Sequence, residues 1–280
     1  MKDTFSGYHP VINMLYFTVV LIFSMFFTNP VCLVISFSCA FIYSVYLNGK
    51  KTLKFNLVFM LPMLIITALL NPLFNHQGVT ILAYLPGGNP LTLESVITGI
   101  TAALMLITVI SWFSCFNKIM TSDKFVYLFG RFIPAISLIL SMSLRLVPRF
   151  KAQIKIISDA QKCIGRDMSN GNLMQKIKNG IKILSVMITW ALENAIETAD
   201  SMKSRGYGLP DRTAFSVFKF RKRDFYALIY VFLCGIYIFV SALLNLYNFT
   251  LFIAYFALCV TPAIINIQED IKWAVLRIKS

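Results

Sequence analysis

The chain has 280 residues, of which 58% are hydrophobic and 14% are charged, whereas an average soluble domain has about 25% charged residues. Its mean hydropathy is +0.72. This composition excludes an ordinary soluble protein, because a soluble core does not shelter so much apolar surface from water. We therefore predict an all-α integral membrane protein located in the cell membrane.

The positive charge of the chain is concentrated in one internal segment. The net charge is +14 at pH 7, and residues 145–223 contain 16 Lys and Arg residues against 6 Asp and Glu residues. A basic excess is typical of nucleic-acid binding, of contact with anionic lipid, or of a topological signal. Because this segment lies between two hydrophobic blocks, its position favours the topological signal. We expect the lipid bilayer, and no nucleic acid, among the partners.

Six apolar segments approach the length of about 20 residues that a membrane-spanning helix needs. They comprise residues 11–27, 31–47, 55–70, 95–116, 225–246 and 249–267. Asn29-Pro30 separates the first two segments, Asn48-Gly49 closes the second, and Asn71-Pro72 is expected to end the third. The pattern predicts about six transmembrane helices.

Lys and Arg residues occur in alternate loops of this arrangement. The loops after the first, third and fifth segments contain no Lys or Arg, whereas those after the second and fourth contain Lys50, Lys51, Lys54, Lys118 and Lys124. Cytoplasmic loops carry the excess of Lys and Arg in membrane proteins. We therefore expect a multi-pass chain with both termini and the basic segment in the cytoplasm.

Residues 125–144 are apolar enough for a seventh span, although they contain Arg131 and Pro134. A single extra crossing would place residues 145–223 outside the cell and reverse the charge bias. We therefore predict a helix that lies at the inner membrane interface or enters the membrane partway. The alternative is that this segment spans the membrane and another segment does not.

The predicted organisation has four parts. Residues 1–122 form an N-terminal transmembrane block of four spans, and residues 123–223 contain the interfacial helix and a cytoplasmic helical domain. Residues 224–268 form a transmembrane hairpin, and residues 269–280 form a cytoplasmic tail. Membrane segments therefore bound the cytoplasmic domain on both sides.

Long amphipathic helices are predicted within the basic segment. Apolar residues recur three or four positions apart at Leu173, Ile177, Ile181, Leu184, Ile188, Leu192, Ala195, Ala199 and Met202. This spacing predicts one helix of about 30 residues, with Asn172 as its N-cap and Gly206 as a left-handed cap after its end. Residues 151–161 predict a shorter helix, with Ile154, Ile157 and Ile164 on one face.

No catalytic residue, metal site or cofactor is expected in this chain. It has no phosphate-binding loop, no nucleophile-elbow or zinc-protease motif, and no paired carboxylates within a span. No charged residue lies deep in a predicted span, where a proton or ion relay would need one. The six Cys residues include no C-x-x-C pair and the two His residues are isolated, which disfavours a metal site.

The end of the long helix has the most informative sequence. The segment Glu197-Thr198-Ala199-Asp200-Ser201-Met202-Lys203-Ser204-Arg205-Gly206-Tyr207 resembles the signature of the transmembrane (T) component of energy-coupling factor (ECF) transporters, roughly A-x-x-M-x-A-R-G-Y. The resemblance implies that Ser204, Arg205 and Gly206 are an ATPase-coupling motif, with Met202 in a supporting position. From periodicity alone, Lys203 and Arg205 also suit a plain helix end, where cations complement the helix dipole.

Two further stretches match the same family in the expected order. Leu144-Arg145-Leu146-Val147-Pro148-Arg149 is similar to the family's L-R-F-x-P stretch, which implies supporting roles for Arg145 and Pro148. The first of two coupling motifs is expected at Cys163, Ile164, Gly165 and Arg166. Ile164 stands in place of that motif's arginine and Arg166 follows two residues later, so the first motif is degenerate.

T components hold two ABC-type ATPase subunits on cytoplasmic coupling helices and a separate substrate-binding S component against their membrane part. The resemblance therefore implies a non-catalytic coupling subunit of an importer for a vitamin or metal ion, with ATP bound by the partner ATPase subunits. The alternatives are a substrate-translocating permease domain of another ABC transporter, a stand-alone secondary carrier, or a membrane-embedded enzyme. A carrier would show polar or broken helices at the midplane, and an enzyme would need clustered His, Asp or Glu.

Overall fold

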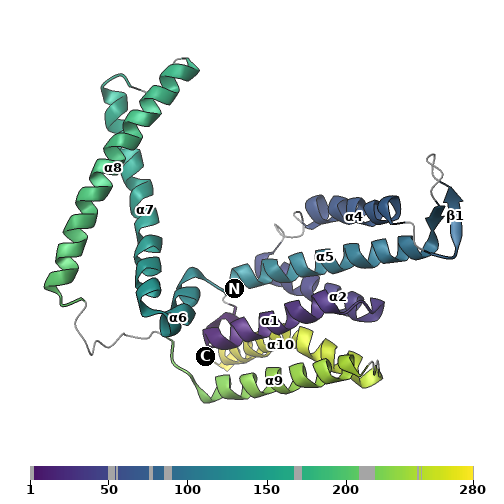
Figure 1. The fold of residues 1–280 in the computed structure, drawn as a ribbon. Helices are drawn as coiled ribbons and strands as arrows, with labels where there is room; N and C mark the ends of the chain where they lie inside the picture. Colours follow the sequence, from purple (N-terminus) through teal and green to yellow (C-terminus); the bar gives the residue numbers. More distant parts are fainter. Residues whose placement is uncertain are drawn as a thin grey trace. The chain divides into compact units, whose positions relative to one another are not determined.

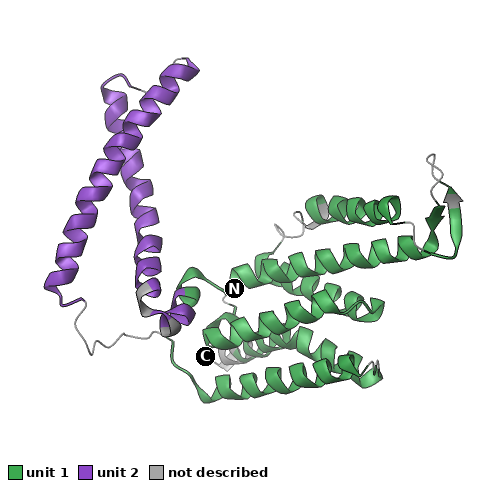
Figure 2. Cartoon of the chain, viewed as in Figure 1, with its two compact units in different colours: residues 1–125, 218–280 green, residues 126–217 purple. Residues whose placement is uncertain are grey.

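The computed structural model describes residues 3–49, 54, 56–75, 78–84, 90–166, 172–207, 218–244, 246 and 248–279. The chain divides into two compact units (Figures 1 and 2). Unit 1 comprises Met1–Phe125 and Phe218–Ser280, and unit 2 comprises Val126–Val217. Unit 2 is thus inserted into unit 1 in the sequence.

Within its described residues, unit 1 is a bundle of long apolar helices that run in alternating directions (Figure 1). They are α1 (Pro10–Phe26), α2 (Pro30–Asn48), α4 (Leu61–Phe74), α5 (Leu93–Ile119), α9 (Lys222–Leu243) and α10 (Phe249–Lys279). Helix α5 packs against α1, α2 and α4, and α10 packs against α2 and α9. Each of the six apolar segments expected from the sequence is helical over most of its described residues, which confirms the predicted fold class.

Four of these helices are long and apolar enough to cross a membrane. They are α2, α5, α9 and residues Phe249–Lys272 of α10, whereas Pro10–Phe26 and Val58–Phe74 are shorter apolar helices. A short π-helical turn, η2 (Asn56–Met60), precedes α4. By length and composition, the described residues therefore contain four candidate spans together with two shorter apolar helices.

Two of these helices begin with the same local chemistry. The Asn29 side chain accepts a hydrogen bond from the Val31 N–H at 3.0 Å, and Pro30 occupies the first helical position. His9 Nδ1 accepts from the Val11 N–H at 3.4 Å in front of Pro10. Proline suits this position because its missing N–H would lack a helical partner there anyway. The predicted break before α2 is therefore the start of that helix.

Helix α4 continues through Pro72, so the prediction that Asn71 and Pro72 end the third segment is wrong. Proline has no N–H to donate to the carbonyl four residues earlier, which belongs to Ala68. Gly99 of α5 lies against this carbonyl, since a β-carbon on Gly99 would be 2.7 Å from it. Helix α5 thus packs closely against the turn of α4 that lacks this hydrogen bond. Helix α4 continues there, although its own sequence predicts an end.

A short antiparallel hairpin, which the sequence did not predict, precedes α5. Strand β1 (Ile81–Tyr84) pairs with β2 (Pro90–Thr92). Glu94 in the first turn of α5 accepts a hydrogen bond from Thr80 Oγ1 at 2.8 Å. Thr92 caps α5 by accepting from the Ser95 N–H at 3.4 Å. The hairpin is therefore tied to the start of α5.

The core of unit 1 is aromatic and contains paired polar groups. The rings of Tyr16, Phe17 and Trp112 lie 5.3–6.4 Å apart in edge-on arrangements, which aromatic pairs prefer. Trp112 Nε1 donates to Ser36 Oγ at 3.0 Å, and Ser36 Oγ lies 2.9 Å from Ser24 Oγ. These contacts join α1, α2 and α5 inside the bundle.

Helix α6 (Ser122–Phe132) leads from unit 1 into unit 2, which also contains α7 (Pro134–Cys163) and α8 (Leu173–Ser204). The segment 125–144, expected as one interfacial helix, is divided at Ile133 between α6 and α7. Ile133 has φ −136° and ψ 86°, because a residue before proline is pushed away from the helical region. The shorter helix expected over residues 151–161 is part of α7.

Helices α7 and α8 form an antiparallel hairpin. Arg149 Nη1 donates to Asn194 Oδ1 at 2.9 Å, and the Phe150 and Trp190 rings lie 5.7 Å apart. A small apolar core follows toward the end of α7 and consists of Ile157, Ile183 and Met187. As the position along α7 rises, the contacted position along α8 falls, which defines the antiparallel packing.

The packed face of this hairpin is not the apolar stripe that the sequence showed most clearly. Of the three isoleucines expected on one face, only Ile157 is buried, whereas Ile154 and Ile164 are 47% and 65% exposed. The apolar stripe predicted along α8 is also largely exposed, at Ile177, Ile181, Leu184, Ile188 and Leu192. Helix α8 has a broad apolar arc, and α7 covers only the edge of it that contains Ile183, Met187 and Trp190.

Candidate functional site at two helix ends

The residues singled out in the sequence lie at the ends of α7 and α8. We call residues 161–166 the first tip and residues 202–207 the second tip. At the second tip, Gly206 has a φ of +74°, and this left-handed conformation confirms the predicted glycine cap. The Tyr207 N–H donates to the Met202 carbonyl at 3.0 Å, and the Gly206 N–H donates to the Lys203 carbonyl at 3.0 Å. These two hydrogen bonds define a Schellman motif.

The first tip ends in the same way. Gly165 has a φ of +78°. The Arg166 N–H donates to the Gln161 carbonyl at 3.0 Å, and the Gly165 N–H donates to the Lys162 carbonyl at 2.9 Å. The first tip therefore has the same Schellman motif as the second, and residues 161–166 align in order with residues 202–207.

This correspondence places Ile164 and Arg205 at equivalent positions. Ile164 has φ −93° and ψ 9°, and Arg205 has φ −87° and ψ 8°. Each residue precedes the left-handed glycine, and both are exposed. The two tips thus present an isoleucine and an arginine from the same backbone geometry. By the same alignment, Arg166 corresponds to Tyr207.

The side chains of Ser204 and Arg205 at the second tip differ in what they contact. Ser204 Oγ donates to the Ser201 carbonyl at 2.9 Å, so this side chain is directed back along its own helix. Within the described part of the chain, no hydrogen bond or ion pair involves the Arg205 guanidinium. An exposed guanidinium offers five N–H donors in a planar arrangement that suits carboxylate groups. At the first tip, Cys163 is an exposed free thiol.

The two tips are far apart along the hairpin. Ile157 packs against Ile183, and α7 runs a further six residues to Cys163, which is about 9 Å at 1.5 Å per residue. In the opposite direction, 21 residues of α8 separate Ile183 from Ser204, which is about 32 Å. The path along the helix axes from one tip to the other is therefore about 40 Å. A single small groove does not accept both ends.

Two of the three supporting residues named from the sequence, Arg145 and Pro148, lie within α7 rather than at a helix end. Arg145 is exposed, and α7 continues through Pro148. The next residue, Arg149, was not among the predicted site residues, although its side chain contacts α8. Its guanidinium carbon lies 5.6 Å from the centroid of the Trp190 ring, in addition to its hydrogen bond to Asn194. Arg149 therefore joins the two helices that end in the tips.

A signal for this contact was present in the sequence. Ile183, Met187 and Trp190 are spaced by four and three residues, which is a second helical stripe beside the one that we identified. Periodicity alone does not decide which of two adjacent stripes is packed. Among the described residues, no group of three or more His, Cys, Asp or Glu residues is arranged to hold a metal ion.

A family model and individual relatives point to the same class of transport protein. The family model described as a cobalt transport protein, CbiQ, matches residues 2–217. The chain is 38% identical over 110 residues to the energy-coupling factor transporter transmembrane protein EcfT of Streptococcus equi subsp. equi (strain 4047), which covers 38% of this chain and 41% of that relative. It is 28% identical over 190 residues to the EcfT of Macrococcus caseolyticus (strain JCSC5402), covering 64% and 66%.

A third relative is the EcfT of Lactococcus lactis subsp. cremoris (strain MG1363), 39% identical over 90 residues that cover 32% of this chain and 34% of the relative. The matched part thus spans about a third to two fifths of the length of the first relatives compared. The family model covers more of the chain than each of these pairwise matches, and it includes both tips.

Proposed function

Because the chain belongs to the cobalt transport protein family CbiQ, we propose that it is the non-catalytic transmembrane coupling subunit of an energy-coupling factor importer. In this role the two tips hold two ABC-type ATPase subunits, which bind ATP. Unit 1 holds a separate membrane-embedded S component, which binds a vitamin or a metal ion as the substrate. The relatives named as ECF transporter transmembrane proteins support this proposal.

The observation that carries the proposal is the pair of matching tips. Two helix ends with the same Schellman geometry stand about 40 Å apart along one hairpin. Such a separation suits two partner molecules, each of which receives one helix end. The basic character of residues 145–223, with 16 Lys and Arg against 6 Asp and Glu, favours partners with acidic grooves.

The uncovered face of α8 supports the presence of further partners. Between 53% and 63% of each side chain is exposed at Ile177, Ile181, Leu184, Ile188 and Leu192. An apolar stripe of this length is typical of a protein interaction surface. We propose that partner subunits cover part of it in the assembled importer.

A charge relay within the spans is disfavoured by the same structure. Among the described Lys, Arg, Asp and Glu residues, the buried ones are Lys124 and Asp224. Both lie in the first turn of a helix, α6 or α9. A carrier that moves ions by itself needs ionisable groups near the middle of its spans. The coupling role is therefore preferred to that of a stand-alone carrier.

Co-purification tests the proposed function. The full-length chain is tagged, expressed in its natural host membrane and purified, and the co-purifying proteins are identified by mass spectrometry. We expect two subunits with ABC-type phosphate-binding loops and a small membrane protein. The chain separated from them should not hydrolyse ATP, whereas the complex should. Recovery without any ABC-type subunit, or ATP turnover by the separated chain, would contradict the proposal.

The orientation of the chain is a related proposal. Asp3, Gly49 and Lys118 line one pocket at the end of the bundle where α2 and α5 terminate. The hairpin of β1 and β2, whose strands contain no Lys or Arg, precedes the opposite end of α5. We propose that the end with Lys118 faces the cytoplasm, together with both termini and unit 2.

Cysteine labelling tests this orientation in a background without native cysteines. In intact cells, a membrane-impermeant reagent should label Val79→Cys, which is beside the hairpin. It should label Asn179→Cys in α8 only after permeabilisation. Labelling of position 179 in intact cells would reverse the proposed orientation.

A further inference from the structure

The chain enters and leaves unit 2 through two connectors that belong to unit 1. The first connector comprises residues 120–125 and the second comprises residues 218–224. Both contact the same short segment, residues 3–9, which we call the strap. These contacts lie within unit 1 and link two parts of the chain that are about 100 residues apart in the sequence.

The strap is anchored in the bundle by one aromatic ring and one amide. Phe5 is 2% exposed, and its ring lies 5.3 Å from that of Tyr16. The Asn266 side chain of α10 accepts hydrogen bonds from the N–H groups of Thr4 (2.9 Å) and Phe5 (3.1 Å), and it donates to Asp3. Two backbone donors of the strap therefore depend on one residue that belongs to neither connector.

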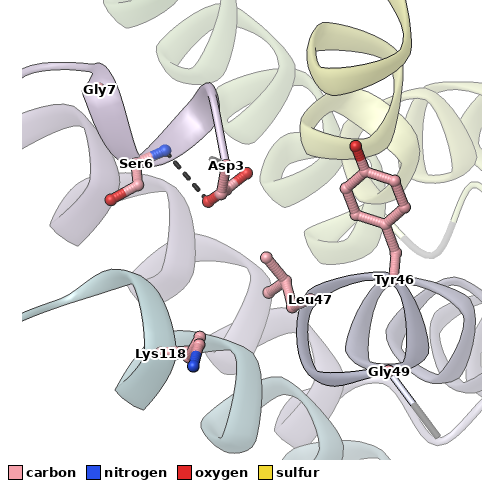
Figure 3. A pocket seen from close by; sticks show the side chains of 7 residues that line it. All are labelled: Asp3, Ser6, Gly7, Tyr46, Leu47, Gly49 and Lys118. Carbon is pink, nitrogen blue, oxygen red and sulfur yellow. Dashed lines mark hydrogen bonds between the residues drawn. The ribbon is translucent and has the colours of Figure 1, made fainter. Parts of the chain in front are cut away.

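Asp3 also shapes the strap itself. Its carboxylate accepts a hydrogen bond from the Ser6 N–H at 3.1 Å, as Figure 3 shows. Figure 3 further shows Asp3 and Ser6 in the pocket at the ends of α2 and α5, near Tyr46 and Lys118. Burial raises the pKa of Asp3, whereas these hydrogen bonds lower it. The strap is thus held in a turn by its own side chain and by α10.

The first connector is joined to the strap by a buried lysine. Lys124 is 4% exposed, and its Nζ donates to the Ser6 carbonyl (2.7 Å), to Ser6 Oγ (2.9 Å) and to the Ile119 carbonyl (2.9 Å). Burial lowers the pKa of Lys124 to about 8, because an ammonium group is poorly solvated there. Three oxygen acceptors compensate for this burial, and two of them belong to the strap.

The second connector is joined to the strap by an arginine and a ring. Arg223 Nη2 donates to the Gly7 carbonyl at 3.2 Å, and its guanidinium carbon lies 4.1 Å from the centroid of the Tyr8 ring, which is within cation–π range. The ring of Phe220 lies 5.2 Å from that of His9. The strap therefore contacts this connector at three successive residues.

We propose that residues 3–9 couple the two connectors, with Lys124 and Arg223 as positioning residues that transmit a change at one connector to the other. The strap is anchored in the bundle by Phe5 and by Asn266 of α10 and has separate contacts with each connector, so loosening it releases both. Its consequence for transport rests on the proposed function, in which unit 2 receives the ATPase subunits. The coupling itself is a property of unit 1.

Amide hydrogen exchange of the full-length chain in lipid nanodiscs tests the coupling. Asn266→Ala removes the acceptor of the strap N–H groups without touching either connector. We expect amide exchange to become about tenfold faster in both connectors, because the loss of one buried and one partly buried hydrogen bond favours local opening. Unchanged exchange in either connector would overturn the proposal.

The coupling must also be reciprocal. Lys124→Met should accelerate exchange in residues 218–224, and Arg223→Met should accelerate it in residues 120–125. Lys222→Met is the matched control, because Lys222 is exposed and is the neighbour of Arg223 in the sequence. This variant should leave amide exchange in the first connector unchanged. Acceleration confined to the mutated connector would show that the strap is a local packing element only. If Lys124→Met does not fold, the other two variants still decide the question.

A transport measurement tests the consequence that depends on the proposed function. In the assembled importer, Arg223→Met should reduce substrate uptake per ATP hydrolysed several-fold while ATPase recovery remains normal. A purely structural role would instead lower the amount of complex and leave this ratio unchanged. If no ATPase subunits assemble with the wild-type chain, the proposed function fails, whereas the exchange measurements still test the strap.

Discussion

The two tips of unit 2 have the same backbone and different chemistry. At each tip a glycine with a φ between +74° and +78° closes a Schellman motif, so the direction in which the preceding side chain leaves the helix is the same. That side chain is Ile164 at the first tip and Arg205 at the second. The comparison shows that the two tips share one backbone geometry and differ in the side chain before the glycine; under the proposed function, that side chain sets what each tip binds.

The largest effect is expected from Arg205→Glu. Removing one partner of a buried, hydrogen-bonded charge pair costs about 2–5 kcal/mol, and reversal of the charge adds repulsion in an acidic groove. We expect recovery of ATPase subunits on the tagged chain to fall at least about thirtyfold and substrate uptake to be lost. Lys182→Glu, a charge reversal on the exposed surface of the same helix, is the control and should retain both. Normal recovery with Arg205→Glu would leave Arg205 as a helix cap alone.

A smaller but more diagnostic effect is expected from exchanging the two side chains. Arg205→Ile alone should reduce ATPase recovery roughly 10- to 100-fold, because a paired carboxylate loses its partner. Adding Ile164→Arg should not restore recovery if each tip fits a different groove. Restoration by the double variant would show that the grooves are equivalent and that the tips are interchangeable.

The glycines should have equal and moderate effects. Gly165→Ala and Gly206→Ala place a β-carbon in a left-handed conformation, which costs about 1–2 kcal/mol. Nothing lies within 4 Å of a β-carbon built on Gly165, so backbone strain is the expected cause there. ATPase recovery should fall about fivefold for each, and Gly→Asn at the same positions should retain most of it, since asparagine tolerates this conformation. Loss at one tip only would mean that the shared geometry is not what the partners require.

The smallest effect is expected from Arg166→Ala. Arg166 aligns with Tyr207 and not with Arg205, so it does not occupy the position that precedes the glycine. We expect ATPase recovery to change less than about threefold, in contrast with Arg205→Ala. Equal losses from the two alanine variants would show that Arg166 replaces the missing arginine and that the tips are chemically similar after all.

Local sequence predicted the features that local chemistry controls. Hydrophobic length located the long helices, Pro and Asn marked the start of α2, and glycine marked the ends of α2 and α8. The left-handed cap at Gly206 was predicted because few other residues adopt that conformation. Ile164 and Arg205 each stand directly before a glycine in the sequence. The hydrogen bonds of both tips establish that the two positions are equivalent.

Features that depend on a neighbouring helix were not predicted. Helix α4 continues past Pro72, where Gly99 of α5 packs against the interrupted turn. Helix α8 packs through Ile183 and Met187, although a second apolar stripe beside them has the same periodicity. The strap contacts of Lys124 and Arg223 join segments distant in the sequence. In each case the deciding contact is tertiary, and no pattern within the segment specifies it.

The position of the small core between α7 and α8 has a mechanical consequence. Measured from Ile157 and its partners, the hairpin extends about 10 Å to the first tip and about 30 Å to the second. A helix hardly stretches, so a partner that moves one tip turns both helices about that core as a lever with unequal arms. A rotation of about 10° would displace the first tip by about 2 Å and the second by about 5 Å. The arm that ends in arginine therefore travels farther.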